Sequence, residues 1–333
     1  MKNNAIILTL AYPDTIVMIS DEWYLTYLRF LGVGKKNYIR AGHAALVLIN
    51  KVTGILEYYD FGRYISPQSN GRVRGKDTDH ELEISIVAEI NDDRIDNLED
   101  ILKFLATNPK LTHGEGKLIA SVCNHVNYEK ASAFIDELQE QYFIKYAAFK
   151  KETINCSRFV TEALIASTTN ASIKRKLVKS KWFTPSTVGN VILSDTENYA
   201  YSVSDEGVIS KFEGSKHTEN LRCFLDRLKS HEPNLNGNLY PKPIEGVHSN
   251  AQWLSGIGAG AWFELHDINH NNEYRFRRIS PYGNIDVDGV FVIAELGFDI
   301  TKDYQFIQNS NCNFLHVKQD ENVYRFDYVR KYD

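Results

Sequence analysis

The sequence predicts an α+β domain followed by a small all-β domain, and three observations lead to this prediction. Apolar runs that suit strands alternate with helical patterns over residues 1–231. Residues 232–250 are rich in Pro, Gly and Asn, as linkers are. Residues 251–333 alternate aromatic and polar side chains between turn dipeptides, which is typical of antiparallel strands. We therefore expect a first domain over 1–231, a linker over 232–250 and an aromatic-rich β domain of unknown role over 251–333.

Within residues 1–231, the periodicity of the apolar residues predicts the following elements in the first half. They are a strand over 5–10, a helix over 21–34, a hairpin over 41–64 that turns at 50–54, a polar loop over 66–79, a strand over 80–90, a helix over 97–108 and a segment over 117–126 that fits either strand or helix. The second half continues with a helix over 128–142, a strand over 143–149, a helix over 156–167, one or two short helices within 171–193, a hairpin over 199–212 and a helix over 217–231.

Length and charge narrow the classes of function. A chain of 333 residues is long for one domain, because a domain usually holds roughly 150 residues. Acidic residues, 43 in number, exceed the 38 basic ones and give a formal net charge of −5. Such a chain offers no basic field to a phosphate backbone, so we expect no nucleic-acid partner. No stretch approaches the roughly 20 apolar residues of a membrane span, and we expect none.

The N-terminal segment MKNNAIILTLAYPD has a short apolar run without a cleavage pattern. It therefore predicts a buried strand, not a signal peptide. We expect a cytoplasmic protein, with secretion that needs no cleaved signal as the alternative. The four cysteines are far apart and lack C-x-x-C spacing, which predicts free thiols and no zinc site. No motif in the chain predicts a metal or another cofactor.

Cys156 stands at the predicted start of a helix, directly after Asn155, a residue type that caps helices. The thiolate is the attacking form of cysteine, and the free N–H groups and positive dipole end of a helix start lower a cysteine pKa. The backbone N–H of the same residue can donate to an oxyanion as a tetrahedral intermediate forms. The position predicts that Cys156 is a nucleophile.

His43 is the candidate partner of this thiol. It follows Gly42 and begins a strand whose other residues, AALVLI, are apolar. A titratable side chain at such a position suggests a functional role. Folding the hairpin about Val52 would place His43 opposite Asp60 or Phe61, and facing side chains of neighbouring strands lie roughly 5 Å apart. Asp60 would then orient the imidazole. Glu57, further back along the same strand, is the alternative orienting acid, and a bulge in the turn would change the choice.

These motifs resemble the circularly permuted, NlpC-type branch of papain-like cysteine hydrolases. The residues that resemble it are Gly42-His43-Ala44-Ala45 on one strand, the segment YYDFGRY at 58–64 on the next, and Asn155-Cys156-Ser157-Arg158-Phe159 at the start of a later helix. Bacterial proteins associated with type VI secretion carry a similar set, and the whole chain resembles a bacterial domain-of-unknown-function family. The departures are Ala45, where a second glycine is common, and the long interval between Asp60 and Cys156.

The resemblance implies a permuted papain-like domain with an antiparallel sheet, in which Cys156 is the nucleophile, His43 the base and Asp60 the acid. The implied reaction is hydrolysis of an amide bond in a peptide or a peptidoglycan stem. A lipid acyltransferase or deacylase of the same fold is the first alternative. A catalytically inactive binding or accessory protein of a secretion system is the second.

Two further regions carry weaker expectations about binding. Arg72 and Arg74, in GRVRGK at 71–76, could form a basic lip for an anionic substrate, but a solvated flexible loop is the favoured interpretation. The aromatic β domain over 251–333 suits a protein partner or a glycan, and plain structural packing is its alternative.

Overall fold

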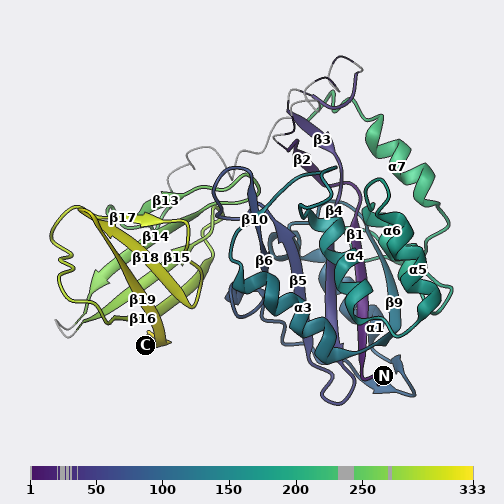
Figure 1. Ribbon diagram of the computed structural model, residues 1–333, viewed down its shortest axis with the longest axis horizontal. Helices are drawn as coiled ribbons and strands as arrows, with labels where there is room; N and C mark the ends of the chain where they lie inside the picture. The colour runs from purple at the N-terminus through teal and green to yellow at the C-terminus, as the bar shows by residue number, and fades with distance from the viewer. Residues whose placement is uncertain are drawn as a thin grey trace.

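The computed structural model of the chain describes residues 2–20, 22, 27, 30, 32–35, 37–231, 244–268 and 272–332. Two sheets dominate it, and they lie side by side (Figure 1). The predicted helix over 21–34 and the predicted linker over 232–250 fall largely outside the described residues. The domain bounds predicted from the sequence remain a prediction.

Within the described residues, the N-terminal sheet has eight strands in the order β10-β6-β5-β4-β1-β9-β11-β12, and each neighbouring pair is antiparallel. The strands are β1 (Ala5–Tyr12), β4 (His43–Asn50), β5 (Leu56–Gly62), β6 (Asn70–Arg74), β9 (Leu118–Val126), β10 (Ile144–Lys145), β11 (Tyr201–Val203) and β12 (Ile209–Lys211). Two small two-stranded antiparallel sheets lie apart from it, β2 (Ile16–Met18) with β3 (Tyr38–Arg40), and β7 (Ile90–Asn91) with β8 (Arg94–Ile95). The central strand β1 is buried along its whole length.

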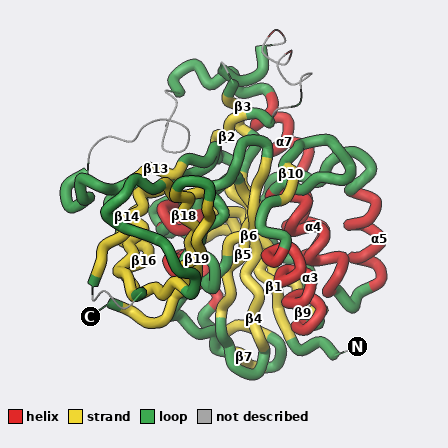
Figure 2. The backbone as a smooth tube through the Cα atoms, turned by 60° about the vertical axis from the view of Figure 1, so that its left-hand side comes forward, coloured by secondary structure: helices red, strands yellow, loops and turns green. Residues whose placement is uncertain are grey.

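Helices cover both faces of this sheet, because alternate residues of β1 and β4 are apolar on each side. One face packs against α1 (Leu98–Thr107). The other packs against α3 (Tyr128–Glu140), α4 (Cys156–Ser167), α5 (Ala171–Ser180) and α6 (Thr187–Ser194), and three of these helices are seen together in Figure 2. The short α2 (Pro109–Thr112) follows α1, and α7 (Lys216–Phe224) lies near β3.

The C-terminal sheet is an all-β unit with an aromatic core. Its strand order is β13-β14-β15-β16-β19-β18-β17, and the strands are β13 (Gln252–Leu254), β14 (Ala261–Asp267), β15 (Glu273–Ile279), β16 (Ile285–Ile293), β17 (Gln305–Ile307), β18 (Phe314–Gln319) and β19 (Asn322–Lys331). The sheet nearly closes on itself, because the side chain of Gln252 in β13 donates to Tyr304 O at 2.9 Å and accepts from Phe306 N at 2.9 Å. Buried phenylalanines fill it, namely Phe263, Phe276, Phe291, Phe306 and Phe326.

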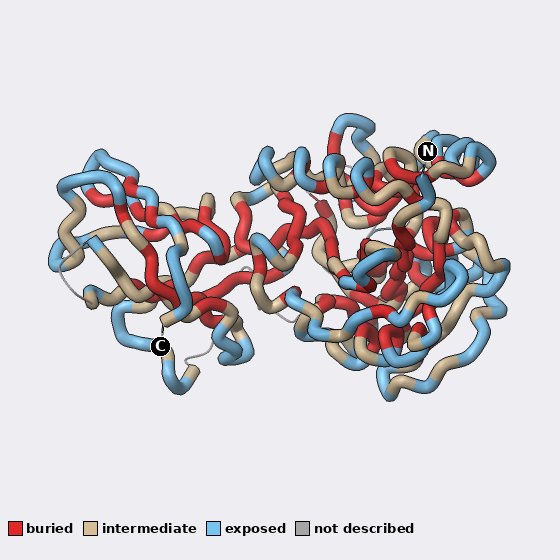
Figure 3. The backbone as a smooth tube through the Cα atoms, turned by 90° about the horizontal axis from the view of Figure 1, so that it is seen from below, coloured by how far each residue is buried: buried red, intermediate tan, exposed pale blue. Residues whose placement is uncertain are grey.

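Buried backbone continues from one sheet into the other (Figure 3). The backbone N–H groups of Ile65 and Gly258 each donate across the junction, to Ala259 O at 2.9 Å and to Arg63 O at 2.8 Å. A short helix, η2 (His80–Leu82), lies between the sheets, and Cys312 N donates to Thr78 O just before it. The predicted α+β class with antiparallel sheets and a C-terminal all-β domain is confirmed.

Two expectations about local structure were wrong. Residues 80–89 form η2 and an extended segment, not a strand, because Val87 makes a single bridge to Ile55 and no ladder follows; Ile90 begins the short β7. The alternation of apolar and polar residues in this segment arises instead because Ile84 and Ile86 both pack against the hydrophobic core. The expected loop over 66–79 contains β6, which pairs with β5.

Candidate active site

Cys156 is the first residue of α4, as predicted, and the cap that starts this helix is well defined. Asn155 has an extended backbone, and its Oδ1 accepts from Arg158 N at 2.9 Å. Its Nδ2 donates to Ala147 O at 3.1 Å, which ties the cap to the preceding loop. The thiol therefore lies where helix N–H groups have no partner within the helix. The Cys156 side chain is partly exposed, whereas the residues around it are buried.

His43 opens β4 and contacts both other candidate residues. Gly42 precedes it with φ 73°, a conformation that favours glycine, and its N–H donates to Thr15 O. The His43 Nε2 lies 3.1 Å from Asp60 Oδ2. The imidazole also lies close enough to the Cys156 thiol for the two groups to shift each other's pKa. The structure thus brings the three predicted residues together.

Asp60 is fully buried and is surrounded by hydrogen-bond donors. Arg74 binds it with two nitrogens, Nε to Oδ1 at 3.0 Å and Nη2 to Oδ2 at 2.7 Å. The hydroxyl groups of Tyr58 and Tyr64 donate to Oδ2 at 3.2 and 3.4 Å. Burial alone would raise the pKa of Asp60, but Arg74 and then His43 hold the pKa well below its ordinary value. Asp60 therefore stays an anion that can hold an imidazolium.

The pKa values of His43 and Cys156 shift in opposite directions. Burial favours neutral His43, yet its hydrogen bonds to Asp60 and Cys156 outweigh that effect and raise its pKa to about 9. Burial opposes a thiolate at Cys156, yet the hydrogen bond and charge of His43 lower the thiol pKa, aided by the Ala44 backbone N–H and Ser157. These directions favour a thiolate–imidazolium pair near neutral pH.

The other three cysteines show the opposite behaviour. Burial raises the pKa of Cys123 to about 12 and also raises the pKa of Cys223 and of Cys312. All three side chains are buried, and none of the four thiols forms a disulfide. Cys156 thus differs from them both in exposure and in the direction of its pKa shift.

Comparisons with known proteins identify the family of this chain. The model of the family described as type VI secretion system effector TseH-like matches residues 7–173, half of the chain. The chain belongs to this TseH-like family. The matched segment contains Cys156, His43 and Asp60. The DUF6695 C-terminal domain matches residues 251–329, which hold the C-terminal sheet.

A comparison with curated proteins finds no match. Among solved structures, the crystal structure of the type VI secretion system effector TseH resembles the TseH-like chain at 20% identity, with a TM-score of 0.42. That match covers 64% of this chain and 100% of the other. Within the described part of the TseH-like protein, no helix is long and apolar enough to cross a membrane, and no cluster of three or more His, Cys, Asp and Glu side chains is arranged to hold a metal ion.

Two details of the predicted site differ in the TseH-like structure. Asp60 pairs with Ala45, one to two residues away from the predicted register, because the turn keeps four residues between Asn50 and Ile55. The Asp60 side chain still reaches His43, because residues two apart on a strand share a face. Glu57 binds Tyr128 Oη at 2.7 Å and Lys76 at 3.3 Å, away from the imidazole.

Arg72 and Arg74 do not form an exposed lip on a loop. They lie on β6 with 6% and 1% exposure. Arg72 binds both oxygens of Asp79 at 2.5 and 2.7 Å, while Arg74 binds Asp60. Both line a cavity between the sheets, so contact with a substrate there stays a prediction.

The sequence reasoning missed the residues that support Asp60. Arg74 was predicted to be a basic residue near the substrate, not the partner of Asp60. Tyr58 and Tyr64 belong to the YYDFGRY segment, but no role was predicted for them from the sequence. Tyr12, whose ring stacks on His43 with centroids 6.4 Å apart, was not singled out. Two arginines spaced by one residue in GRVR do carry a signal, since this spacing puts both on one face of a strand.

Removing the cap of α4 is expected to weaken both the fold and the thiolate. We expect Asn155→Ala to lower the free energy of unfolding by about 1–2 kcal/mol, measured by urea denaturation, and to slow alkylation of Cys156 by iodoacetamide. Asn170→Ala is the matched control, because Asn170 caps α5 through Ser172 N and Ile173 N. Equal alkylation rates in the two variants would contradict a role of the α4 start in thiolate formation.

Proposed function

We propose that this TseH-like protein is a cysteine hydrolase that cleaves an amide bond of a peptide or of a peptidoglycan stem. The observation that carries the proposal is the placement of three side chains: His43 Nε2 lies 3.1 Å from Asp60 Oδ2, and Cys156, at the start of α4, is near enough to His43 for each to shift the pKa of the other. A nucleophile, a base and an orienting group in this order are the parts that acyl transfer requires.

The first step forms an acyl-enzyme. The Cys156 thiolate attacks the amide carbonyl carbon, and the C–S bond forms as the carbonyl electrons move onto oxygen. The backbone N–H of Cys156, at the start of α4, can donate to that oxyanion. When the tetrahedral intermediate collapses, the C–N bond breaks and the His43 imidazolium gives its proton to the leaving amine.

The second step releases the acid. Neutral His43 removes a proton from water, the resulting hydroxide attacks the thioester carbonyl, and Cys156 leaves as the thiolate while the imidazolium forms again. Asp60 stays ionised throughout and holds the ring in one tautomer and one orientation. No cofactor is needed in either step.

We also propose that the catalytic part has the permuted, NlpC-type papain-like arrangement. Three features support this: the histidine precedes the nucleophile in the chain, it lies on an antiparallel sheet, and the nucleophile begins a helix packed on that sheet. Membership of the TseH-like family is compatible with this class of enzyme.

Digestion of purified peptidoglycan tests the proposal. We expect the wild-type chain to release new amino groups from sacculi and to change the muropeptides seen by mass spectrometry. Cys156→Ala and His43→Ala should each abolish this release, whereas Cys223→Ala should retain it, because the pKa of that thiol is raised. Cleavage by Cys156→Ala at the wild-type rate would rule out this nucleophile. Intact sacculi with a reactive Cys156 would rule out peptidoglycan as the substrate.

Lipid deacylation is a second candidate, which one surface feature favours. Trp182 and Phe183 are 83% and 73% exposed, and exposed aromatic side chains suit a membrane interface. The segment that carries them is connected to the cap of α4, because Thr184 and Asn155 both donate to Ala148 O, at 2.9 and 3.3 Å. Release of fatty acid from phospholipid vesicles, lost in Cys156→Ala, would select this candidate over amide hydrolysis.

A further inference from the structure

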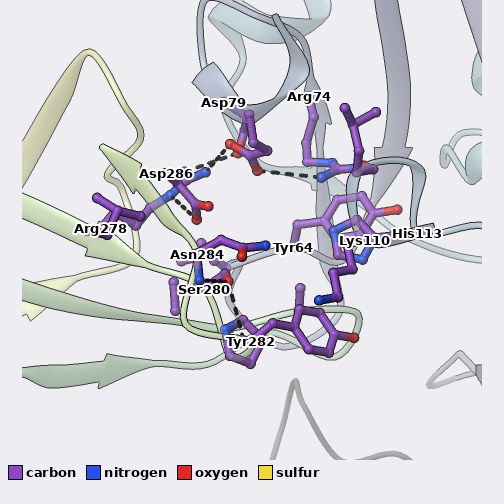
Figure 4. A pocket seen from close by; sticks show the side chains of 18 of the residues that line it. Tyr64, Arg74, Asp79, Lys110, His113, Arg278, Ser280, Tyr282, Asn284 and Asp286 are labelled. Atoms are coloured by element: carbon purple, nitrogen blue, oxygen red, sulfur yellow. Dashed lines mark hydrogen bonds and ion pairs between the residues drawn. The ribbon is translucent and has the colours of Figure 1, made fainter. Parts of the chain in front are cut away.

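A cluster of ion pairs joins the C-terminal sheet to the candidate active site (Figure 4). Its centre is Arg278 of β15, which is 1% exposed. The Arg278 guanidinium binds three carboxylates: Asp79 at 3.1 Å, Glu81 at 2.7 Å and Asp286 at 3.2 Å. Asp286 belongs to the C-terminal sheet, whereas Asp79 and Glu81 lie in the segment after β6. Arg278 of the C-terminal sheet is therefore held by one acid of its own sheet and by two acids of the segment that follows β6.

The same acids also face the arginines of β6. Asp79 accepts from both ends of the Arg72 guanidinium. Glu81 lies 3.7 Å from Arg74 Nη1, and Arg74 holds Asp60 with its other nitrogens. A path of direct contacts thus runs from Arg278 through Glu81 and Arg74 to Asp60, and from there to His43.

Loss of Arg278 would change which groups pair. A carboxylate that loses its closest counterion attracts the next cation more strongly, and the Glu81 side chain is only 24% exposed. For Glu81 the other arginine in contact is Arg74, so Arg74 would be drawn away from Asp60. There is room for this movement, because a cavity of about 290 Å³ adjoins Arg74, Glu81 and Arg278.

We propose that Arg278 is a positioning residue for the acid of the active site. Because Arg278 pairs with Glu81 and Asp79, Arg74 remains bound to Asp60. The C-terminal β domain thereby completes the active site, whose other residues lie in the segment that matches the TseH-like family. The proposal rests on the role of Asp60 in the proposed function. It gives the C-terminal sheet a part in catalysis that acts through Arg74 and Asp60.

Arg278→Met in the full-length chain tests this proposal. Displacement of Asp60 should lower kcat about 10- to 100-fold with KM nearly unchanged, which is the range for a misplaced catalytic group. The midpoint of the pH dependence of Cys156 alkylation should rise, because an imidazolium held less well by Asp60 favours the thiolate less. The alkylation measurement needs no substrate, so it separates failure of this proposal from failure of the proposed reaction.

A second substitution distinguishes positioning from mere packing. In Arg278→Met with Glu81→Gln, the acid that competes for Arg74 is gone, so kcat and the alkylation midpoint should return toward wild type. Loss of packing alone would not be repaired in this way. Arg275→Met is the matched control, because Arg275 binds Asp288 within the C-terminal sheet, with both distances at 2.7 Å, and it should leave both readouts unchanged.

Near-UV circular dichroism and thermal unfolding show whether each variant is folded. Where Arg278→Met does not fold, Arg278→Lys keeps the charge but reaches fewer of the three carboxylates, and it should shift the same midpoint by a smaller amount. A folded Arg278 variant with wild-type kcat and an unchanged midpoint overturns the proposal. A shifted midpoint that Glu81→Gln does not restore overturns it as well.

Discussion

Replacing Asp60 by Asn should reduce amide hydrolysis by about 10²–10⁴-fold, the scale seen when the acid of a catalytic triad becomes an amide. The amide cannot favour an imidazolium as the carboxylate does, and it can stabilise the wrong tautomer of His43. Because the hydrogen bond and charge of Asp60 help to raise the pKa of His43, this pKa should fall in the variant. Steady-state rates and the pH profile of the rate measure both effects.

The same substitution should also destabilise the fold. It removes the closest counterion of the buried Arg74 guanidinium and leaves only Glu81, at 3.7 Å, within ion-pairing distance among the described residues; breaking a buried pair from one side costs about 3–5 kcal/mol. Since the pKa of Asp60 is lowered in the folded chain, its stabilisation is present above the ordinary carboxyl pKa and is lost as the pH falls through the lowered value. The variant should therefore lose stability mostly at neutral pH, as denaturant unfolding at two pH values would show.

Asp288→Asn is the control for this prediction, because Asp288 also binds an arginine with both oxygens but is partly exposed and distant in sequence from the thiol. Its effect on unfolding should be smaller, and hydrolysis should be unchanged. Wild-type hydrolysis by a folded Asp60→Asn would show that this carboxylate does not orient His43.

Cys156 should be alkylated at pH 6.5 at least tenfold faster than the other three cysteines, because the thiolate is the reacting form. As the pH falls, the alkylation rate of Cys156 should stay high until the pH reaches the pKa of this thiol, which is lower than the ordinary thiol pKa. Hydrolysis needs the imidazolium as well and should decline as the pH rises through about 9, the raised pKa of His43. A bell-shaped rate profile with a broad neutral plateau follows.

Mass spectrometry after a timed iodoacetamide pulse measures the reactivity of each thiol. His43→Gln should move the alkylation midpoint of Cys156 up toward the ordinary thiol value, since the imidazolium that lowers the pKa is gone. Cys223 provides an internal reference in every sample, because burial raises its pKa. A Cys156 midpoint that His43→Gln leaves unmoved would exclude the ion pair.

The residues of the candidate site could be predicted where the signal is local. A capping Asn before Cys156 predicts the helix start from adjacent residues, and the structure has α4 beginning at that residue. A histidine after Gly42 at the head of an apolar strand is likewise a local pattern. Both residues lie in the segment that the TseH-like family model matches.

The surroundings of the site could not be predicted, because they depend on register and on long-range contacts. The turn between β4 and β5 sets which residue faces Asp60, and one extra residue in the loop changes every pair. Arg278 is 199 residues from Asp79, and no periodicity links such positions. The burial of Arg74 was missed for the same reason, since charged side chains in a polar segment usually lie in solvent.

The Gln252 side chain, which joins β13 to β17, limits how the C-terminal unit can recognise another molecule. An open sheet invites a foreign strand to add to its edge through main-chain pairing. Here the Gln252 amide occupies the Tyr304 carbonyl and the Phe306 N–H that such a strand would need. A strand that added at this edge would therefore first have to displace the Gln252 amide from both groups.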